Sequence, residues 1–300
     1  MSSASPSESF RVTRGGVRLD RVVAEALGCG RRAARELLRS GRVLVDGRTA
    51  AAASAPPRDA LIVVAAAPAP AGSGAVRDAG TVSVLWEGDG LLAVSKPAGL
   101  HSQRGRERGS VADFLAVRYP GIAEVGDDAR ECGLVHRLDR DTSGVLLAAT
   151  TRRAYRDARR AFAEKTVAKS YLALVRGAVE SELTIDTTLA RRRTRVVPAR
   201  RGDRRLPAST GIEPLEQGGS WSLVRATMRT GVTHQVRAHL ALAGHPIIGD
   251  LKYGQLAAPA GTRDGQLLHA SRIVLPDGTA IEVDAPDDFE AAHALLAAQR

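Results

Sequence analysis

Hydrophobic positions near the N-terminus predict a small unit of helices and strands. Apolar residues in 19–27 recur at the spacing of one helix face, and 31–39 predicts a second helix. Alternating residues at 43–45 and a Val-rich run at 61–64 predict two strands. We therefore expect short elements that share one small hydrophobic core.

A longer series of strands and helices is predicted from residue 81 to residue 300. Strands show period-2 alternation or short apolar runs, whereas helices show apolar residues three and four positions apart. We expect strands at 82–86, 91–94, 144–149, 170–176, 222–228, 273–275 and 281–283, and helices at 111–118, 151–165, 235–243 and 289–299. This mixture predicts the α/β (α+β) fold class for the second unit.

Two segments that are poor in large apolar residues mark the domain boundaries. Residues 1–14 are rich in Ser and predict a flexible tail. Residues 67–80 consist mainly of Ala, Pro, Gly and Ser, a composition typical of linkers. The predicted domains are therefore 15–66 and 81–300.

Composition and charge narrow the class of protein. The chain is 44% hydrophobic, and its 43 Lys and Arg residues against 33 Asp and Glu residues give a formal charge of +10. This balance favours a polyanionic partner such as RNA, although an Arg-rich and Ala-rich composition also arises from genome base content alone. The two cysteines, Cys29 and Cys132, are too far apart in sequence for a disulfide framework. With no secretory signal pattern and no apolar run near about 20 residues, we expect a cytoplasmic monomer without a membrane partner.

A dense cluster of charges of both signs stands directly before a buried strand. His136, Arg137, Asp139, Arg140 and Asp141 precede the apolar run at 144–149. Burying charges is costly unless they pair, and loops on a rigid scaffold often carry active sites. Asp139 is our candidate for the reacting group. By its pattern alone, such an Arg-Leu-Asp loop is more often a structural ion pair than a catalytic centre.

The first unit resembles an S4 RNA-binding domain. The resemblance rests on Arg18-Leu19-Asp20 and on 38–47, Leu-Arg-Ser-Gly-Arg-Val-Leu-Val-Asp-Gly. It implies that the second helix and the following turn contact RNA. Arg31, Arg35 and Arg39 are four residues apart, so they share roughly one helix face and are our candidate RNA-binding residues. The alternative is a merely solvated arginine face.

The second unit resembles the RluA-type pseudouridine synthases. Its residues 136–144, His-Arg-Leu-Asp-Arg-Asp-Thr-Ser-Gly, look like the signature of that family. Three further stretches resemble family motifs in the expected order: 96–100, 169–173, and 230–240 followed by 244–250. The resemblance implies an S4-like domain plus a catalytic domain with a central mixed, largely antiparallel sheet flanked by helices.

The resemblance also implies roles for individual residues. Asp139 matches the catalytic aspartate, Tyr171 the stacking tyrosine that is proposed to help remove the C5 proton, and Arg237 the arginine paired with the aspartate. The implied substrate-binding residues are Arg137, associated with flipping the base, together with His136 and Leu240. The family usually has Arg where this chain has Val232, a position that would contact RNA or position the loop.

The implied reaction is the isomerisation of uridine to pseudouridine. The N1–C1′ bond breaks, the base turns and a C5–C1′ bond forms, so no electrons or groups are exchanged with other molecules and no cofactor is expected. We also expect no metal, because His234, His239 and His245 lack a carboxylate or thiol at a known ligand spacing. Members with an N-terminal S4 domain mostly modify large-subunit ribosomal RNA, which makes ribosomal RNA the preferred partner and transfer RNA the alternative.

Two other interpretations remain open at this point. The chain could bind RNA without catalysis on the same fold, or it could be a hydrolase that uses Asp139 and a histidine. Basic stretches at 152–160 and 191–205 would bind phosphates in either case. The second stretch, with eight Arg residues, is either a disordered loop or an RNA-contacting hairpin.

Overall fold

Two units, residues Met1–Ala75 and Val76–Arg300, make up the chain in the computed structural model, and each is described by itself. The structure describes residues 8–27, 34, 35, 37, 38, 43–49, 54–64, 82–105, 109–255 and 257–298. The predicted linker 67–80 lies outside these residues.

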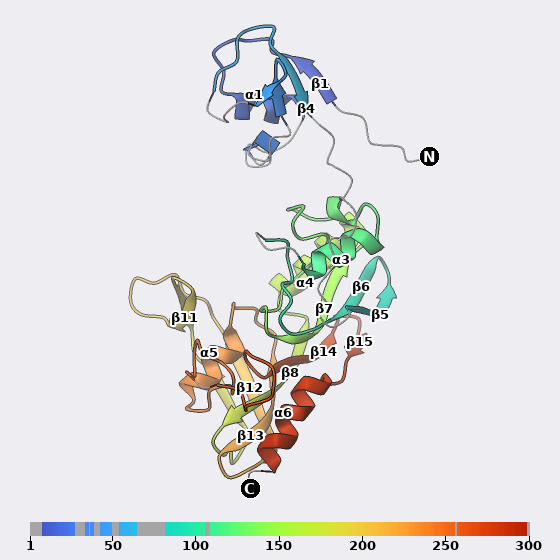
Figure 1. Ribbon diagram of the computed structural model, residues 1–300. Helices are drawn as coiled ribbons and strands as arrows, with labels where there is room; N and C mark the ends of the chain where they lie inside the picture. The colour runs from blue at the N-terminus through green and yellow to red at the C-terminus, as the bar shows by residue number, and fades with distance from the viewer. Residues whose placement is uncertain are drawn as a thin grey trace. The chain divides into compact units, whose positions relative to one another are not determined.

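The first unit, drawn in blue in Figure 1, places one described helix against a four-stranded antiparallel sheet. Its elements are β1 (Glu8–Arg11), α1 (Leu19–Ala26), β2 (Val43–Val45), β3 (Arg48–Thr49) and β4 (Leu61–Val64). The strand order is β1-β4-β2-β3. Leu19 and Val23 of the helix are fully buried in one core with Ile62 of the sheet, as the helical spacing of 19–27 predicts.

The predicted flexible tail of residues 1–14 is wrong for its second half. Residues Glu8–Arg11 form β1, which pairs antiparallel with β4 in the register Phe10 to Ile62. Phe10 packs against the core and Val12 is 1% exposed. These two apolar residues, two positions apart, bury one side of the segment despite its Ser-rich start.

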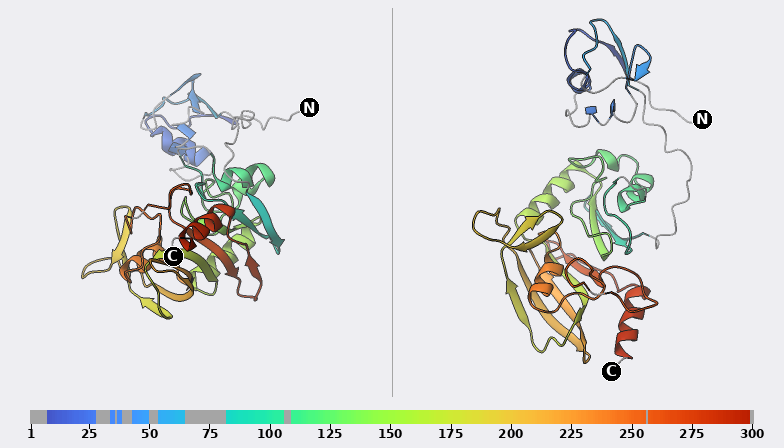
Figure 2. Two further views of the ribbon diagram at one scale, coloured as in Figure 1. Left: turned by 60° about the horizontal axis from the view of Figure 1, so that its bottom comes forward. Right: turned by 60° about the vertical axis from the view of Figure 1, so that its left-hand side comes forward.

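The second unit is built on a nine-stranded sheet with helices on it (Figure 2). The strand order is β5-β6-β7-β14-β8-β13-β12-β9, with β15 pairing β14. Every pairing is antiparallel except the parallel contact of β7 with β14, which confirms the expected mixed, largely antiparallel sheet. The strands are β5 (Ser83–Gly88), β6 (Leu91–Lys96), β7 (Ser143–Ala149), β8 (Ala168–Arg176), β9 (Leu183–Asp186), β12 (Ser209–Gln217), β13 (Trp221–Met228), β14 (Leu268–Val274) and β15 (Ala280–Glu282).

Helices cover both faces of this sheet, as the side chains of β8 show, which point alternately to one face and to the other. Tyr171, Ala173 and Val175 point into the main core, together with α3 (Val111–Arg118) and α4 (Arg152–Ala163). Leu172 and Leu174 point the other way, where α6 (Asp287–Ala297) packs. The remaining helices of the described residues are α5 (Gln235–Leu242) and the short 3-10 helix η1 (Ile122–Glu124).

The arginine-rich stretch forms a hairpin that stands out from the second unit in Figures 1 and 2. Strands β10 (Leu189–Arg192) and β11 (Arg195–Pro198) pair antiparallel as a separate two-stranded sheet. Leu189 and Val196 are buried against Ala238 of α5, whereas the arginines at 191–193 and 195 are exposed. Of the two interpretations of 191–205, the structure favours the ordered hairpin; its contact with RNA stays a prediction.

A glycine permits the one parallel strand contact of the sheet. Gly144 in β7 has a positive φ of 117°, and a Cβ placed there would lie 2.2 Å from the carbonyl oxygen of Ala270 in β14. Only a residue without a side chain fits such a close approach of two backbones. This contact lies five residues beyond Asp139 and fixes where the charged loop joins the sheet.

We predict that Gly144→Ala lowers the free energy of unfolding by about 3 kcal/mol, from the positive φ and the overpacking together. Gly278→Ala is the matched control, because Gly278 also has a positive φ, of 91°, but nothing lies within 4 Å of its added Cβ. Urea unfolding of both variants measures the difference. Equal losses of stability would contradict the close-approach argument.

Candidate active site

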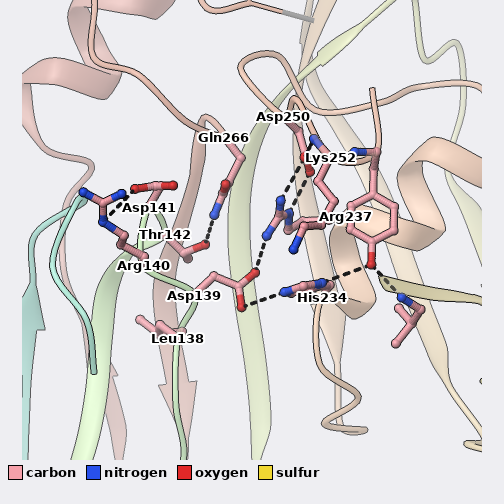
Figure 3. Close-up of polar contacts among 12 residues, drawn as sticks. Leu138, Asp139, Arg140, Asp141, Thr142, His234, Arg237, Asp250, Lys252 and Gln266 are labelled. Carbon is pink, nitrogen blue, oxygen red and sulfur yellow. Dashed lines mark hydrogen bonds and ion pairs between the residues drawn. The ribbon is translucent and has the colours of Figure 1, made fainter. Parts of the chain in front are cut away.

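The carboxylate of Asp139 lies between two side chains from the same segment. Arg237 Nη1 of α5 donates to Asp139 Oδ2 at 2.7 Å. His234 Nε2 lies 3.6 Å from the other oxygen, Oδ1. Figure 3 shows both contacts converging on the Asp139 carboxylate from the side of α5. The sequence places these residues about a hundred positions apart, and the sheet brings them together.

Arg237 bridges two carboxylates. Its Nε and Nη2 donate to Asp250 Oδ2 and Oδ1 at 2.7 and 2.8 Å, while Nη1 serves Asp139. Burial lowers the pKa of Arg237, but its hydrogen bonds and charge interactions with Asp250 and Asp139 outweigh this and raise it overall. All three nitrogens of the guanidinium are therefore engaged, which fixes its orientation toward Asp139.

Asp250 anchors this bridge from behind. Its side chain is fully buried, and Oδ1 also accepts the backbone N–H groups of Lys252 and Tyr253 at 2.9 and 3.1 Å. Burial alone would raise the pKa of Asp250. Arg237 and the two backbone donors outweigh this effect, so the pKa of Asp250 lies below its ordinary value. Asp250 is thus held as the carboxylate that a buried guanidinium needs.

A buried lysine holds the loop that carries Asp139 through hydrogen bonds to backbone carbonyls. Lys96 is fully buried at the end of β6, and its Nζ donates to the carbonyls of Arg140, Leu100 and Pro97 at 2.7, 2.7 and 2.8 Å. Burial lowers the pKa of Lys96 to about 7. Three acceptors match the three N–H donors of an ammonium group. The motif at 96–100 therefore ties its own turn to the loop of Asp139.

Other polar side chains fix both flanks of the same loop. Ser102 Oγ donates to the Leu138 carbonyl at 2.8 Å and accepts the Leu138 N–H at 3.1 Å. Gln266 Nε2 donates to Thr142 Oγ1 at 3.1 Å, a contact that Figure 3 also draws. Arg263 Nη1 donates to the Asp141 carbonyl at 2.8 Å. Backbone groups on either side of Asp139 are thereby held in place.

A cavity of about 540 Å³ opens beside Asp139. Tyr171 of β8 lies in its wall and is 7% exposed. Burial, with a contribution from the charge of Asp139, raises the pKa of Tyr171 above its ordinary value, so the phenol keeps its proton. The volume suits a single nucleoside-sized ligand, which would meet both an aromatic face and a carboxylate.

The charge of the cavity wall is positive. Its lining includes Arg137, Arg159, Lys165, Lys169 and Arg237, whereas Asp139 is the one carboxylate among the lining residues. Such a wall attracts an anionic ligand, and Asp139 is the acidic side chain that this ligand would meet.

The predicted substrate-binding residues divide into three cases. Arg137 is exposed and lines the cavity, so its guanidinium is accessible to a ligand there. His136 also lines it, but its ring stacks on Phe162 at 4.9 Å and its Nε2 accepts the Leu147 N–H at 3.0 Å. Leu240 is 1% exposed in the main core and is not among the residues that line the cavity, because its side of α5 faces the sheet.

The predicted RNA-binding arginines of the first unit are described only in part. Arg31 and Arg39 lie outside the described residues. Arg35 is exposed, and its Nε donates to the buried carboxylate of Asp20 at 2.7 Å. Arg35 therefore has a structural contact, and its contact with RNA stays a prediction.

The three clustered histidines have partners other than a metal. His239 contacts Thr210 Oγ1 and the Thr187 carbonyl at 2.8 and 3.1 Å, and His245 contacts the Arg176 carbonyl at 3.1 Å. Within the part of the chain that the structure describes, no group of three His, Cys, Asp or Glu side chains is placed to hold a metal ion. Among the same residues, no helix is long and apolar enough to cross a membrane.

Sequence reasoning missed the residues that support Asp139. Lys96 and Asp250 both stand inside the stretches that resemble family motifs, and this position was the available signal. Tyr253 and Arg263 lie outside every motif, so only the structure shows their contacts. The candidate reacting residues Asp139, Tyr171 and Arg237 all stand in motifs, whereas two of the residues that support Asp139 do not.

Comparisons with known proteins agree with this architecture. The family model for RNA pseudouridylate synthase matches residues 90–242, and the S4 domain model matches 17–56. An uncharacterized RNA pseudouridine synthase of Mycobacterium bovis is 36% identical over 294 residues, which cover 93% of this chain and 94% of that protein. The ribosomal large subunit pseudouridine synthase D of Nitrosomonas europaea is 35% identical over 226 residues, 70% of this chain and 64% of the relative's own length, which is less than two thirds.

A solved structure shows the same fold. The human RNA pseudouridylate synthase domain containing 1 matches with a TM-score of 0.57 and 30% identity, over 72% of this chain and 86% of that structure. The fold and the matched models define an S4 domain followed by an RNA-modifying isomerase domain. The chain belongs to the RluA-type family of RNA pseudouridine synthases. The resemblance in its sequence motifs is thereby confirmed.

The unusual environment of His136 predicts an acid-sensitive fold. Burial, with the charges of Lys169 and Arg159, lowers the pKa of His136 to about 3 from its ordinary 6.5. Between these values the unfolded chain binds a proton that the folded chain does not, so stability is lost as the pH falls below about 6.5. From pH 7 to pH 5 this group contributes a loss of up to about 2 kcal/mol.

His136→Gln tests this assignment because the Gln side-chain oxygen accepts the Leu147 N–H without titrating. Denaturant unfolding at pH 7 and at pH 5 should show a smaller loss for this variant than for the wild type. The other buried histidines, including His269, keep their own share of the loss in both proteins. Identical losses would show that His136 is not the group concerned.

Proposed function

We propose that this protein isomerises specific uridines in structured RNA to pseudouridine, with Asp139 as the reacting carboxylate. The observation that carries the proposal is the bridge of Arg237 between Asp139 and the buried Asp250, set at a cavity that also holds Tyr171. The family membership supports the reaction class, and this arrangement supports the assignment of residues.

The contacts supply what the reaction needs. Asp139 must be ionised to attack or to abstract, and the adjacent guanidinium stabilises that charge. Tyr171 offers an aromatic face to the uracil, and its raised pKa favours stacking over service as a free phenolate. The detached base has to stay bound while it turns, and a cavity of about 540 Å³ with buried residues such as Tyr171 in its wall favours its retention and limits attack by water.

The proposed substrate is large-subunit ribosomal RNA. The name of the Nitrosomonas europaea relative supports this choice, and so does the S4 domain. The target base has to leave its stack to reach Asp139, and Arg137 at the cavity mouth is the proposed residue for this step. We further propose that the protein acts in the cytoplasm as a monomer.

Two basic surfaces of the second unit would hold the RNA backbone. The arginines at 152, 153, 156, 159 and 160 are exposed on α4, while Ala154, Tyr155 and Ala158 are buried beneath them. The hairpin β10–β11 and the turn after it expose arginines at 191–193, 195, 200, 201, 204 and 205. Such surfaces bind phosphates without reading sequence.

We predict that Asp139→Asn abolishes pseudouridine formation and leaves RNA affinity within about threefold, because it removes the reacting charge but none of the basic surface. The measurement is nucleoside analysis of RNA from cells that lack the protein, after incubation with each variant, together with filter binding. Full activity of Asp139→Asn would overturn the assignment.

Asp141→Asn is the matched control, since Asp141 stands on the same loop but its side chain does not line the cavity. It should keep most of the activity. Free uracil in place of pseudouridine would instead support a hydrolase, and binding without either product would support a non-catalytic RNA-binding protein. Modification of transfer RNA alone would favour the alternative substrate.

A further prediction concerns the turn that follows the hairpin β10–β11. Arg200→Gln combined with Arg201→Gln should weaken RNA binding and lower the slope of log affinity against log salt by about 1 to 2, because each lost phosphate contact removes roughly 0.7 to 0.9 from it. Arg118→Gln combined with Arg272→Gln removes the same charge from other surfaces and should leave the slope nearly unchanged. Equal effects of the two pairs would mean that only net charge matters.

A further inference from the structure

The second oxygen of Asp139 begins a chain of polar contacts that leads to the arginine-rich hairpin. His234 Nε2 lies 3.6 Å from Asp139 Oδ1, and His234 Nδ1 lies 3.0 Å from the hydroxyl of Tyr253. The Val196 N–H of β11 donates to that hydroxyl at 2.8 Å. Four residues from four separate segments are thus connected end to end.

One assignment of donors and acceptors satisfies every contact of this chain. The Tyr253 oxygen accepts the Val196 N–H at 2.8 Å, and we assign the hydroxyl proton to His234 Nδ1, which lies 3.0 Å away. A neutral imidazole that accepts at Nδ1 carries its proton at Nε2, facing Asp139. Burial lowers the pKa of His234, against the opposing effect of Asp139, which agrees with a neutral ring.

The backbone at His234 has a conformation that is uncommon for a residue with a side chain. Its φ of 57° lies in the left-handed region, where Gly or Asn is preferred. Its side chain makes no capping hydrogen bond to α5, although it occupies the N-cap position. Because neither the backbone conformation nor a capping hydrogen bond favours a histidine here, the contacts of its ring explain its placement. These contacts are with Asp139 and Tyr253.

We propose that His234 is a positioning residue that holds Asp139 Oδ1 through its Nε2–H, and that Tyr253 sets the tautomer of His234. This inference rests on the proposed function of Asp139. With Arg237 on Oδ2 and His234 on Oδ1, the plane of the carboxylate is fixed toward the cavity. The gap of 3.6 Å closes to hydrogen-bond length when RNA fills the cavity, as contacts of this kind tighten in the substrate complex.

The hairpin in turn fixes Tyr253. Beside the Val196 contact, the Arg195 guanidinium stacks 5.4 Å from the centre of the Tyr253 ring. The neighbouring Lys252 Nζ donates to the Thr194 carbonyl of the hairpin at 3.2 Å. The element proposed to bind the RNA backbone therefore also places the residue that orients His234, which joins RNA docking to the geometry of Asp139.

Two substitutions at the same position separate positioning from a merely structural role. In His234→Gln the amide nitrogen replaces Nε2 and keeps a donor for Asp139, whereas in His234→Asn the shorter amide reaches only the place of Nδ1. Asn tolerates the left-handed backbone better than Gln, so a structural role predicts that Asn is the milder change. Our proposal predicts the opposite order, in which His234→Gln reacts faster than His234→Asn.

The rate is measured as the release of tritium from C5-labelled uridine in bulk RNA from cells that lack the protein. Single-turnover reactions with excess protein separate the maximal rate from the protein concentration at half saturation. His234→Asn should lower the maximal rate about 30-fold or more and His234→Gln less than 10-fold, with half saturation unchanged in both. Equal rates, or a faster Asn variant, would overturn the proposal.

Tyr253→Phe tests the second half, because it keeps the ring that packs beside Arg195 and Arg237 but removes the hydroxyl. It should lower the maximal rate about 5- to 20-fold, and adding it to His234→Asn should cause no further loss, since it acts through His234. Additive losses would show independent effects. If a His234 variant fails to fold, Tyr253→Phe decides alone, and an unchanged rate overturns the proposal.

Asp139→Asn, assayed in parallel, distinguishes the two levels of inference. If Asp139→Asn is inactive while His234→Asn and Tyr253→Phe are fully active, the positioning role is refuted and the proposed function stands. An active Asp139→Asn refutes the proposed function of that carboxylate, whatever the His234 variants do.

Discussion

The guanidinium of Arg237 between two carboxylates is the interaction on which the site depends. A buried ion pair is costly to desolvate and is stable only where its hydrogen bonds are complete. Here Asp250 accepts hydrogen bonds from two nitrogens of Arg237 in the interior, and the third nitrogen donates to Asp139 at the cavity. The inner carboxylate thus holds the cation, and the cation holds the outer carboxylate in place.

The architecture of the second unit supplies this geometry from distant segments. Arg237 comes from α5, Asp250 from the loop after it, and Asp139 from the loop before β7. The loop of Asp139 is tied to β6 by Lys96 and to the segment before β14 by Gln266. Because these ties use backbone carbonyls or a threonine hydroxyl, they constrain the position of the loop without adding another carboxylate to the cavity.

The elements were predictable where the hydrophobic period was regular. Residues 111–118 form α3 with the predicted bounds, and Thr151 caps α4 by accepting the Ala154 N–H. β1 was missed because four residues in a Ser-rich segment carry too little pattern, and its pairing with β4 depends on tertiary contact. Asp139 was a candidate from its charged loop alone, whereas its pairing with Arg237 came from motif resemblance, since no local pattern links residues so far apart in sequence.

The supporting residues escaped prediction for a physical reason. A lysine is ordinarily expected at the surface because its side chain is charged. Lys96 is nevertheless fully buried, because three carbonyl groups accept hydrogen bonds from its Nζ. Convergence of backbone groups has no sequence period, so it cannot be inferred from spacing. The same holds for Tyr253, whose hydroxyl receives a backbone N–H from a hairpin 57 positions earlier.

The departure at Val232 gains a structural context from these contacts. Val232 and Tyr253 both pack against the small cluster that includes Val196 and Ala238. An apolar side chain there adds packing around the residues that join the hairpin to α5, where an arginine would add a charge at the cavity wall. Four other cations besides Arg237 already line that wall, namely Arg137, Arg159, Lys165 and Lys169. The loss of one cation at position 232 therefore leaves the positive field of the cavity in place, while the apolar contact favours the rigid placement of the Tyr253 ring.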